Sequence, residues 1–166
     1  MKQKILYLTC GVAGSGKSTY IQKVMGNDTL WISRDKVRAE FLSDEDKNMF
    51  AYEDEVFSTF CNRIQAALDD ENGPDGIWAD ATHLTENARN QVLDRLNLEN
   101  VSVIPVYFDV PLKQIIAQNE NREGRAYVPQ SVIRKMYSRY KFPTYNEKHK
   151  YAHIVKIMNG KVEDVI

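Results

Sequence analysis

Hydrophobic and polar positions follow two alternating patterns along the chain. Short apolar runs rich in β-branched and aromatic side chains predict buried strands at residues 4–10, 30–33, 77–81 and 101–110. Between them, apolar side chains recur every three or four residues, which predicts helices at residues 17–25, 35–42, 48–71, 85–96, 111–119 and 129–140. Two last strands, at residues 153–158 and 161–165, flank Asn159 and Gly160, a pair typical of a hairpin turn.

Strands that alternate with helices predict an α/β fold, in which a parallel sheet carries helices on both faces. The chain has 166 residues, of which 43% are hydrophobic and 27% charged. This size fits one domain, residues 1–166, with a single core. Ligands of such sheets bind at the carboxyl ends of the strands. The residues that follow each strand are therefore the first candidates for function.

The apolar runs are too short to cross a bilayer, and the N-terminal run is shorter than the core of a secretory signal. We therefore expect a cytoplasmic protein that has no membrane partner. Cys10 and Cys61 are expected to be buried thiols in a reducing compartment. The sequence does not decide between a monomer and a homo-oligomer.

Charge is unevenly distributed along a chain whose net charge is −1. Residues 1–100 carry a net charge of −6 and residues 101–166 one of +5. This balance argues against non-specific wrapping of long nucleic acids, but it allows a local site for an anion. Residues 40–75 contain eleven acids and two basic side chains. We interpret them as a solvated helix face, although at an acceptor site they would repel nucleic acid.

The first strand leads into the sequence GVAGSGKS, residues 11–18, and then into a helix. This is the phosphate-loop pattern G-x-x-x-x-G-K-[ST], whose backbone N–H groups surround phosphate oxygens at a helix N-terminus. Lys17 is expected to reach the β- and γ-phosphates, and Ser18 to bind Mg²⁺. We predict ATP or another nucleoside triphosphate as ligand, bound by Gly11, Gly14, Ser15, Gly16, Lys17, Ser18 and Thr19.

Asp35 and Arg38 follow the second strand and lie three residues apart, so they share one face of the next helix. A carboxylate at this strand end is suited to accept the proton of an attacking hydroxyl group. The planar guanidinium of Arg38 is suited to bind a phosphate or carboxylate of a second substrate. The alternative is structural: Asp35 caps the helix and Arg38 pairs with it.

A polar loop, about residues 119–129, carries Arg122 and Arg125 between two helices. An arginine that closes over the γ-phosphate stabilises the charge that develops during phosphoryl transfer. We expect this segment to be a lid and one of the two arginines to act in this way. Otherwise both are solvated surface side chains.

Several of these segments, taken together and in order, resemble a known family. The ordered segments GVAGSGKSTY, ISRDKVRAEF, WADATHLT, FDVPL, NENREGRAYVP, VIRKMY and FPTYNE are similar to the kinase domain of phage-type polynucleotide 5′-kinases. The resemblance implies a P-loop kinase fold with an arginine-bearing lid, ATP and Mg²⁺ as cofactors, and transfer of the γ-phosphate to the 5′-hydroxyl end of DNA or RNA. Single-stranded or nicked ends would be the acceptors.

The resemblance also implies roles for single residues. Asp35 would be the general base, Arg38 would bind a phosphate of the acceptor, and Asp80 and Thr82 would also lie on the acceptor side. Lys17 would be catalytic, together with Arg122 or Arg125. The sequence departs from the family at His83, where an amide is usual, and Asp80 stands one position upstream of the expected acid. The Asp-x-Asp-Gly-Thr motif of the 3′-phosphatase domain is absent, so a kinase alone is expected.

Two other functions fit the same pattern. A P-loop kinase for a small acceptor, such as a nucleoside, a sugar or an antibiotic, would share the fold, because fold does not determine substrate. A nucleotide-dependent binding module would share the phosphate loop but would need no base at Asp35.

Overall fold

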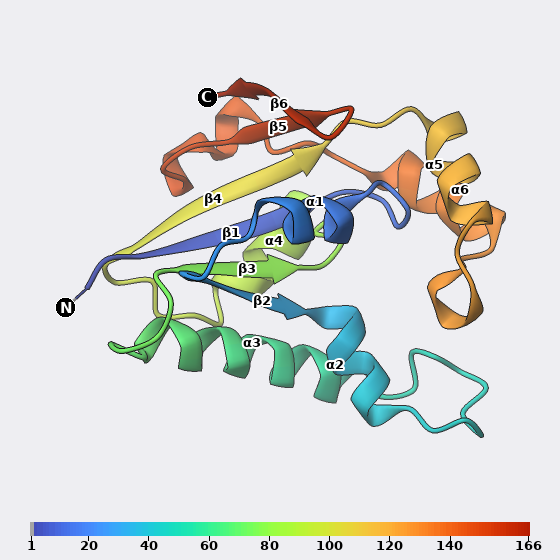
Figure 1. Cartoon of the computed structure of the whole chain (residues 1–166), viewed down its shortest axis with the longest axis horizontal. Coiled ribbons are helices and arrows are strands. Elements are labelled where there is room, and N and C mark those ends of the chain that lie inside the picture. The colour runs from blue at the N-terminus through green and yellow to red at the C-terminus, as the bar shows by residue number, and fades with distance from the viewer. Residues whose placement is uncertain (1) are drawn as a thin grey trace.

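The structure is a computed structural model that describes residues 2–166. In this part of the chain, six strands form one sheet in the order β2-β3-β1-β4-β5-β6 (Figure 1). Pairing is parallel throughout except between β5 and β6. The strands are β1 (Lys4–Cys10), β2 (Thr29–Ser33), β3 (Gly76–Asp80), β4 (Val101–Phe108), β5 (Val155–Met158) and β6 (Lys161–Val165). The predicted α/β architecture is confirmed.

Helices cover both faces of the sheet and its carboxyl end. They are α1 (Lys17–Val24), α2 (Arg34–Phe41), α3 (Glu53–Asp69), α4 (Glu86–Leu93), α5 (Leu112–Glu120) and α6 (Gln130–Arg139), with short 3₁₀ turns η1 (Gly124–Ala126) and η2 (Tyr145–Lys150). In Figure 1 the arrows of β2, β3 and β4 point toward the region where α2, α5 and α6 lie. None of the helices in residues 2–166 is long and apolar enough to cross a bilayer.

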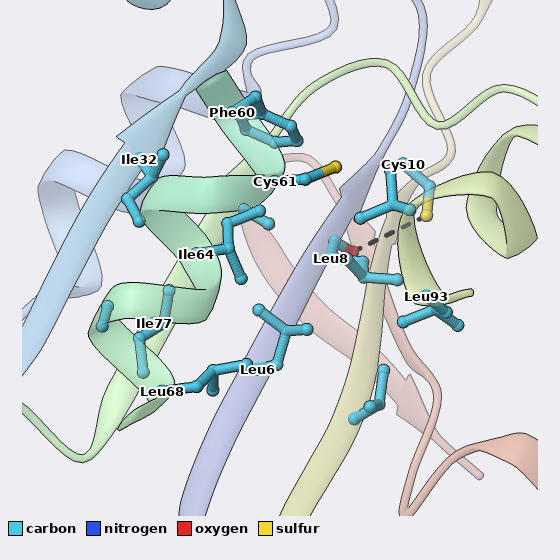
Figure 2. Packing of buried hydrophobic residues seen from close by; sticks show 14 of the residues in the cluster. Leu6, Leu8, Cys10, Ile32, Phe60, Cys61, Ile64, Leu68, Ile77 and Leu93 are labelled. Atoms are coloured by element: carbon cyan, nitrogen blue, oxygen red, sulfur yellow. Dashed lines mark hydrogen bonds between the residues drawn. The ribbon is translucent and has the colours of Figure 1, made fainter. Parts of the chain in front are cut away.

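The alternation of side chains along β1 separates the core into two layers. Leu6, Leu8 and Cys10 face α3 and α4, where they pack against Ile64 and Leu93 among others (Figure 2). On the opposite face, Ile21 of α1 packs against side chains of β3, β4 and β5. The buried face of α3 arises from apolar residues at helical spacing, as the sequence predicts.

A third apolar cluster lies at the carboxyl end of the sheet. Val12 of the loop after β1 packs against Ile115 of α5 and Ile133 of α6. The hydroxyl of Tyr140 donates hydrogen bonds to the carbonyl oxygens of Cys10 at 2.7 Å and of Phe108 at 3.2 Å. The end of α6 is thus attached to the ends of β1 and β4, which positions it beside the strand ends.

The structure corrects some predicted boundaries. The helix expected at residues 48–71 begins at Glu53, and residues 48–52 form turns. There the side chain of Asn48 accepts a hydrogen bond from the backbone N–H of Phe50, which competes with helical hydrogen bonding. Residues 141–150, where neither a helix nor a strand was predicted, contain η2, which begins with a capping box between Thr144 and Glu147. The hairpin at Asn159 and Gly160 is present, and both residues have positive φ.

Candidate active site

The loop between β1 and α1 adopts the backbone that its glycines allow. Gly14 and Gly16 have φ angles of 87° and 90°, a left-handed region that glycine enters without steric cost. The Lys17 Nζ atom donates hydrogen bonds to the carbonyl oxygens of Gly11 at 3.0 Å and Val12 at 3.1 Å. The ammonium group is therefore held within the loop, where phosphate oxygens would replace these carbonyl groups as its partners.

Ser18, at the start of α1, contacts the end of β3. Its hydroxyl donates a 2.8 Å hydrogen bond to Oδ2 of Asp80, and Trp31 Nε1 donates to the same oxygen at 3.0 Å. The other carboxylate oxygen accepts a 3.1 Å hydrogen bond from the hydroxyl of Thr9. Mg²⁺ prefers oxygen ligands and binds through one or two carboxylates together with substrate phosphates. The adjacent hydroxyl and carboxylate fit such an ion.

Asp80 and Thr82 were expected on the acceptor side, and both adjoin the phosphate loop. Asp80 is buried and contacts Ser18, the predicted metal ligand. The carbonyl oxygen of Thr82 accepts a 2.9 Å hydrogen bond from the backbone N–H of Gly11. The segment after β3 therefore supports the start of the phosphate loop. Contact of either residue with an acceptor stays a prediction.

Lys17 interacts electrostatically with three other predicted site residues. Burial lowers the pKa of Lys17 below its ordinary value, and the positive charge of Arg122 acts in the same direction. The carboxylates of Asp80 and Asp35 oppose this shift and favour the charged ammonium. The lid, the phosphate loop and the ends of β2 and β3 thus bring their charged side chains together.

Asp35 lies in the first turn of α2, directly after β2. The helix begins one residue earlier than predicted, and the hydroxyl of Ser33 accepts a hydrogen bond from the N–H of Lys36 as its N-cap. Because Ser33 caps the helix, the interpretation of Asp35 as the cap is wrong. The Asp35 side chain is 80% exposed, so its carboxylate is accessible to a second substrate.

Arg38 is buried between two carboxylates. Its Nη1 pairs with Asp35, and its Nε pairs with Glu53 at the start of α3. Arg34 Nη2 donates to the same Glu53 at 3.0 Å. Burial alone would raise the pKa of Glu53, but the hydrogen bond from Arg38 and the charges of both arginines lower it overall. Glu53 was missed from the sequence, where it is one of many acids in residues 40–75.

The lid is closed at its base by one buried amide. Asn119 donates a 2.6 Å hydrogen bond to the carbonyl oxygen of Val128 and accepts a 3.0 Å hydrogen bond from the backbone N–H of the same residue. The two lid arginines point to different places. Arg122 acts on Lys17, and its buried Nη1 has no hydrogen-bond partner among residues 2–166, whereas Arg125 donates to the carbonyl oxygen of Ser43 at 2.7 Å.

His83 occupies the position where the resembling family has an amide. Its φ angle is 40°, and its Nδ1 lies 2.6 Å from the carbonyl oxygen of Thr9, so Nδ1 carries the proton. Burial lowers the pKa of His83 to about 4, and nearby positive charges, among them Arg34, act in the same direction. The imidazole is therefore neutral near pH 7 and acts as an uncharged donor, as an amide would.

A buried ion pair fixes the segment that contains His83. Arg89 of α4 forms hydrogen bonds to both carboxylate oxygens of Glu147, at 3.0 and 2.7 Å. Its Nη1 also donates to the carbonyl oxygens of His83 at 2.9 Å and Lys141 at 3.0 Å. The pair thus joins the strand end that supports the phosphate loop to the segment after α6. It was also missed from the sequence.

Solved structures with a similar fold include kinases of different substrates. A fungal RNA kinase has a TM-score of 0.65 and 16% identity, over 99% of this chain and 78% of that one. A chain of the Pnkp1/Rnl/Hen1 RNA repair complex has a TM-score of 0.66 and 20% identity, over 91% of this chain and 47% of its own length. A sugar kinase from Janibacter sp. HTCC2649 has a TM-score of 0.61 and 18% identity, over 93% and 86% of the two chains.

At these identities the likeness shows the fold alone. A search of the curated proteins found no match to the sequence. Residues 6–143 match the family described as AAA domain. Because this match extends over most of the chain, the protein belongs to the AAA domain family, and it has the fold of a P-loop kinase.

Proposed function

We propose that the protein transfers the γ-phosphate of ATP to the 5′-hydroxyl end of a DNA or RNA strand. The observation that carries this proposal is that a cationic group of the lid and an exposed carboxylate after β2 both act electrostatically on Lys17. Arg122 acts on Lys17 from the lid, and Asp35 acts on it from the end of β2. A donor phosphate bound to Lys17 would therefore be influenced by both a base and a cationic group.

The donor half of the site would be formed by the phosphate loop. Lys17 would exchange its carbonyl partners for oxygens of the β- and γ-phosphates. Ser18 would hold Mg²⁺, with Asp80 beside it. When bound, the ion would neutralise charge on the phosphates as the transfer proceeds.

The acceptor half would be formed by Asp35 and Arg38. The exposed carboxylate of Asp35 would take the proton from the acceptor hydroxyl as its oxygen bonds to the γ-phosphorus. The bond from that phosphorus to the bridging oxygen breaks at the same time, and ADP leaves. Arg122 would stabilise the negative charge on the transferred phosphoryl group. Arg38 would hold a phosphate of the acceptor, while Glu53 fixes its guanidinium in place.

A kinase of a small acceptor is the second candidate. The similarity to a sugar kinase over 93% of this chain favours it as a specific alternative. The two candidates differ in what Arg38 binds, because a polynucleotide acceptor carries a phosphate next to the reacting nucleotide and a sugar does not.

One experiment separates these functions. The purified protein is incubated with γ-labelled ATP, Mg²⁺ and either a 5′-hydroxyl DNA strand, a 5′-hydroxyl RNA strand, a nucleoside 3′-phosphate, a nucleoside or a sugar. Label transfer to the strands and to the nucleoside 3′-phosphate, with little transfer to the other two, supports the proposal. Transfer to a bare nucleoside or a sugar alone contradicts it. Binding of ATP without transfer to any acceptor would favour a binding module.

A further inference from the structure

Residues 124–162 carry a large excess of positive charge. Residues 124–162 contain nine lysines and arginines and one acid, Glu147. Glu147 is buried and paired with Arg89, so it contributes no negative charge to the surface. The exposed charges of this segment are therefore all positive. The excess is visible in the sequence, and the burial of Glu147 shows that no exposed acid of this segment offsets it, although Lys150 and Lys156 pair with Glu86 and Asp109 of other segments.

Helix α6 carries much of this charge on its outer side. Ile133, Met136 and Tyr140 lie at helical spacing and pack into the cluster beside the phosphate loop. Arg134, Lys135 and Arg139 are exposed, and their charged groups have no salt-bridge partner among residues 2–166. We refer to Arg134, Lys135 and Arg139 as the basic face of α6.

Exposed aromatic side chains accompany the basic face. Tyr137 lies on α6, three residues from Arg134, and Phe142 follows the helix; each is about 40% exposed. Tyr145 is 81% exposed on the next turn, and Tyr127 is exposed on the lid. Cationic side chains interleaved with exposed aromatic rings are the surface that binds single-stranded nucleic acid, through phosphate contacts and base stacking.

Helix α6, which carries the basic face on its outer side, packs beside the candidate active site. The inner side of α6 belongs to the same cluster as Val12 of the phosphate loop and Leu84, which follows His83. The acidic residues 40–75 lie instead on α2, α3 and the segments around them. A polyanion that reaches Asp35 with its 5′ end therefore meets repulsion along α3 and attraction along α6.

We propose that the basic face of α6, together with Tyr137, binds the single strand downstream of the reacting 5′ end. This inference rests on the proposed polynucleotide kinase function and adds a route for the acceptor. The three cations would contact backbone phosphates, and the ring of Tyr137 would stack on a base. Recognition would be independent of sequence, because phosphates and base faces are common to every strand.

The test compares two triple variants with the wild-type protein. R134Q/K135Q/R139Q removes the basic face, and K23Q/K47Q/K161Q removes the same charge from exposed lysines on α1, on the loop before α3 and on β6. Binding of a 3′-labelled 5′-hydroxyl 20-nucleotide single strand is measured by fluorescence anisotropy over a range of salt concentrations. Phosphorylation of the 20-mer and of a nucleoside 3′-phosphate is measured in parallel.

The slope of log K against log salt should become shallower by about 2 in R134Q/K135Q/R139Q, since each phosphate contact with a single strand contributes about 0.7. KM for the 20-mer should rise at least about tenfold in this variant, while kcat and the KM for the nucleoside 3′-phosphate stay unchanged. The control variant should behave as the wild type. Tyr137→Ala should weaken strand binding by about fivefold or more without changing the salt slope.

Equal salt slopes and equal KM values for the 20-mer in the two triple variants would overturn the inference while leaving the kinase function intact. Conversely, loss of strand binding in R134Q/K135Q/R139Q alone, in a protein that phosphorylates no strand, would support the surface and contradict the proposed kinase function.

Discussion

The hydroxyl of Ser18 and the carboxylate of Asp80 form a 2.8 Å hydrogen bond that connects the phosphate loop to the end of β3. Trp31, on the neighbouring strand, donates to the same carboxylate oxygen. The orientation of Asp80 is thus fixed from both sides, by α1 and by β2. A carboxylate held in this way is prepared for a cation beside Ser18 without rearrangement of the loop.

We expect Asp80→Asn to raise the Mg²⁺ concentration needed for half-maximal activity by about 10- to 100-fold, the usual effect of losing a group that supports a metal ion. The reason is the loss of the negative charge that contacts the hydroxyl of Ser18. The measurement is a Mg²⁺ titration of phosphoryl transfer at saturating ATP. Asp54→Asn, on an exposed acid of α3, serves as the matched control. An unchanged Mg²⁺ dependence in the Asp80 variant would show that this carboxylate does not support the ion.

We expect Asp35→Asn to reduce kcat by roughly 10²–10⁴-fold, the usual contribution of a general base, and to leave ATP affinity within about threefold. The amide keeps the shape and the contact with Arg38 but cannot accept the proton. Single-turnover transfer and calorimetric titration with an ATP analogue measure the two quantities. If ATP affinity fell in parallel with the rate, Asp35 would be acting on the donor and not as the base.

We expect Arg122→Ala to slow phosphoryl transfer by at least about 10²-fold, because its guanidinium acts on Lys17 and has a free buried donor. Arg125→Ala should have a much smaller effect, since Arg125 contacts the carbonyl oxygen of Ser43. The two variants are matched controls for each other in a steady-state assay at saturating substrates. The reverse order would assign the γ-phosphate contact to Arg125.

We expect the folded protein to become less stable as the pH decreases, because the buried imidazole of His83 resists protonation. In the unfolded chain the imidazole takes up a proton near pH 6.5, whereas in the folded protein it does so only near pH 4. Between these values the unfolded state binds more protons, so the free energy of unfolding decreases as the pH falls. The full loss is about 3 kcal/mol, at 1.36 kcal/mol for each unit of pKa difference.

His83→Asn should remove this pH dependence between pH 6.5 and 4.5. Asparagine tolerates a positive φ and can donate to the carbonyl oxygen of Thr9. Urea denaturation at several pH values gives the comparison, and His149→Asn, at an exposed histidine, is the control. A slope that persists in the His83 variant would place the titrating group elsewhere.

We expect the fluorescence of Trp31 to report magnesium nucleotide binding. The indole N–H is bonded to Asp80, and the ammonium of Lys36 lies 3.6 Å from the ring centroid, so a cation near Asp80 changes the field at the ring. Titration with MgADP should change the emission of the wild type and of Trp78→Phe, but not of Trp31→Phe. A response that survives in Trp31→Phe would mean that Trp78 or a wider movement of the protein produces it.

The sequence predicts the donor side of this site well and the acceptor side less well, for a physical reason. The phosphate loop, the order of strands and helices, and the strand-end positions of Asp35 and Asp80 follow from local patterns with fixed spacing. The contact of Glu53 with Arg38 spans 15 residues, and that of Glu147 with Arg89 spans 58. Neither pair has a spacing that a helix or a strand imposes, so each is visible only once the chain is folded.

The distribution of charge on the surface also could not be predicted from the sequence, because it depends on which charged side chains are buried. Glu147 counts as one of six acids in residues 101–166, and only its burial reveals that α6 and η2 expose no acidic side chain of their own. Likewise, the sequence leaves both Arg122 and Arg125 as candidates for the γ-phosphate, and the fold separates them, because Arg125 donates to the carbonyl oxygen of Ser43 whereas Arg122 acts electrostatically on Lys17.

The buried pair of Arg89 and Glu147 also has a consequence for the order in which the protein can fold during its synthesis. Arg89 leaves the ribosome well before its partner, and a guanidinium enclosed without a carboxylate is strongly destabilising. The nascent chain therefore cannot complete the support of the phosphate loop until residue 147 has emerged. A nucleotide site encoded in the first part of the gene thus depends for its support on a residue encoded in the last part.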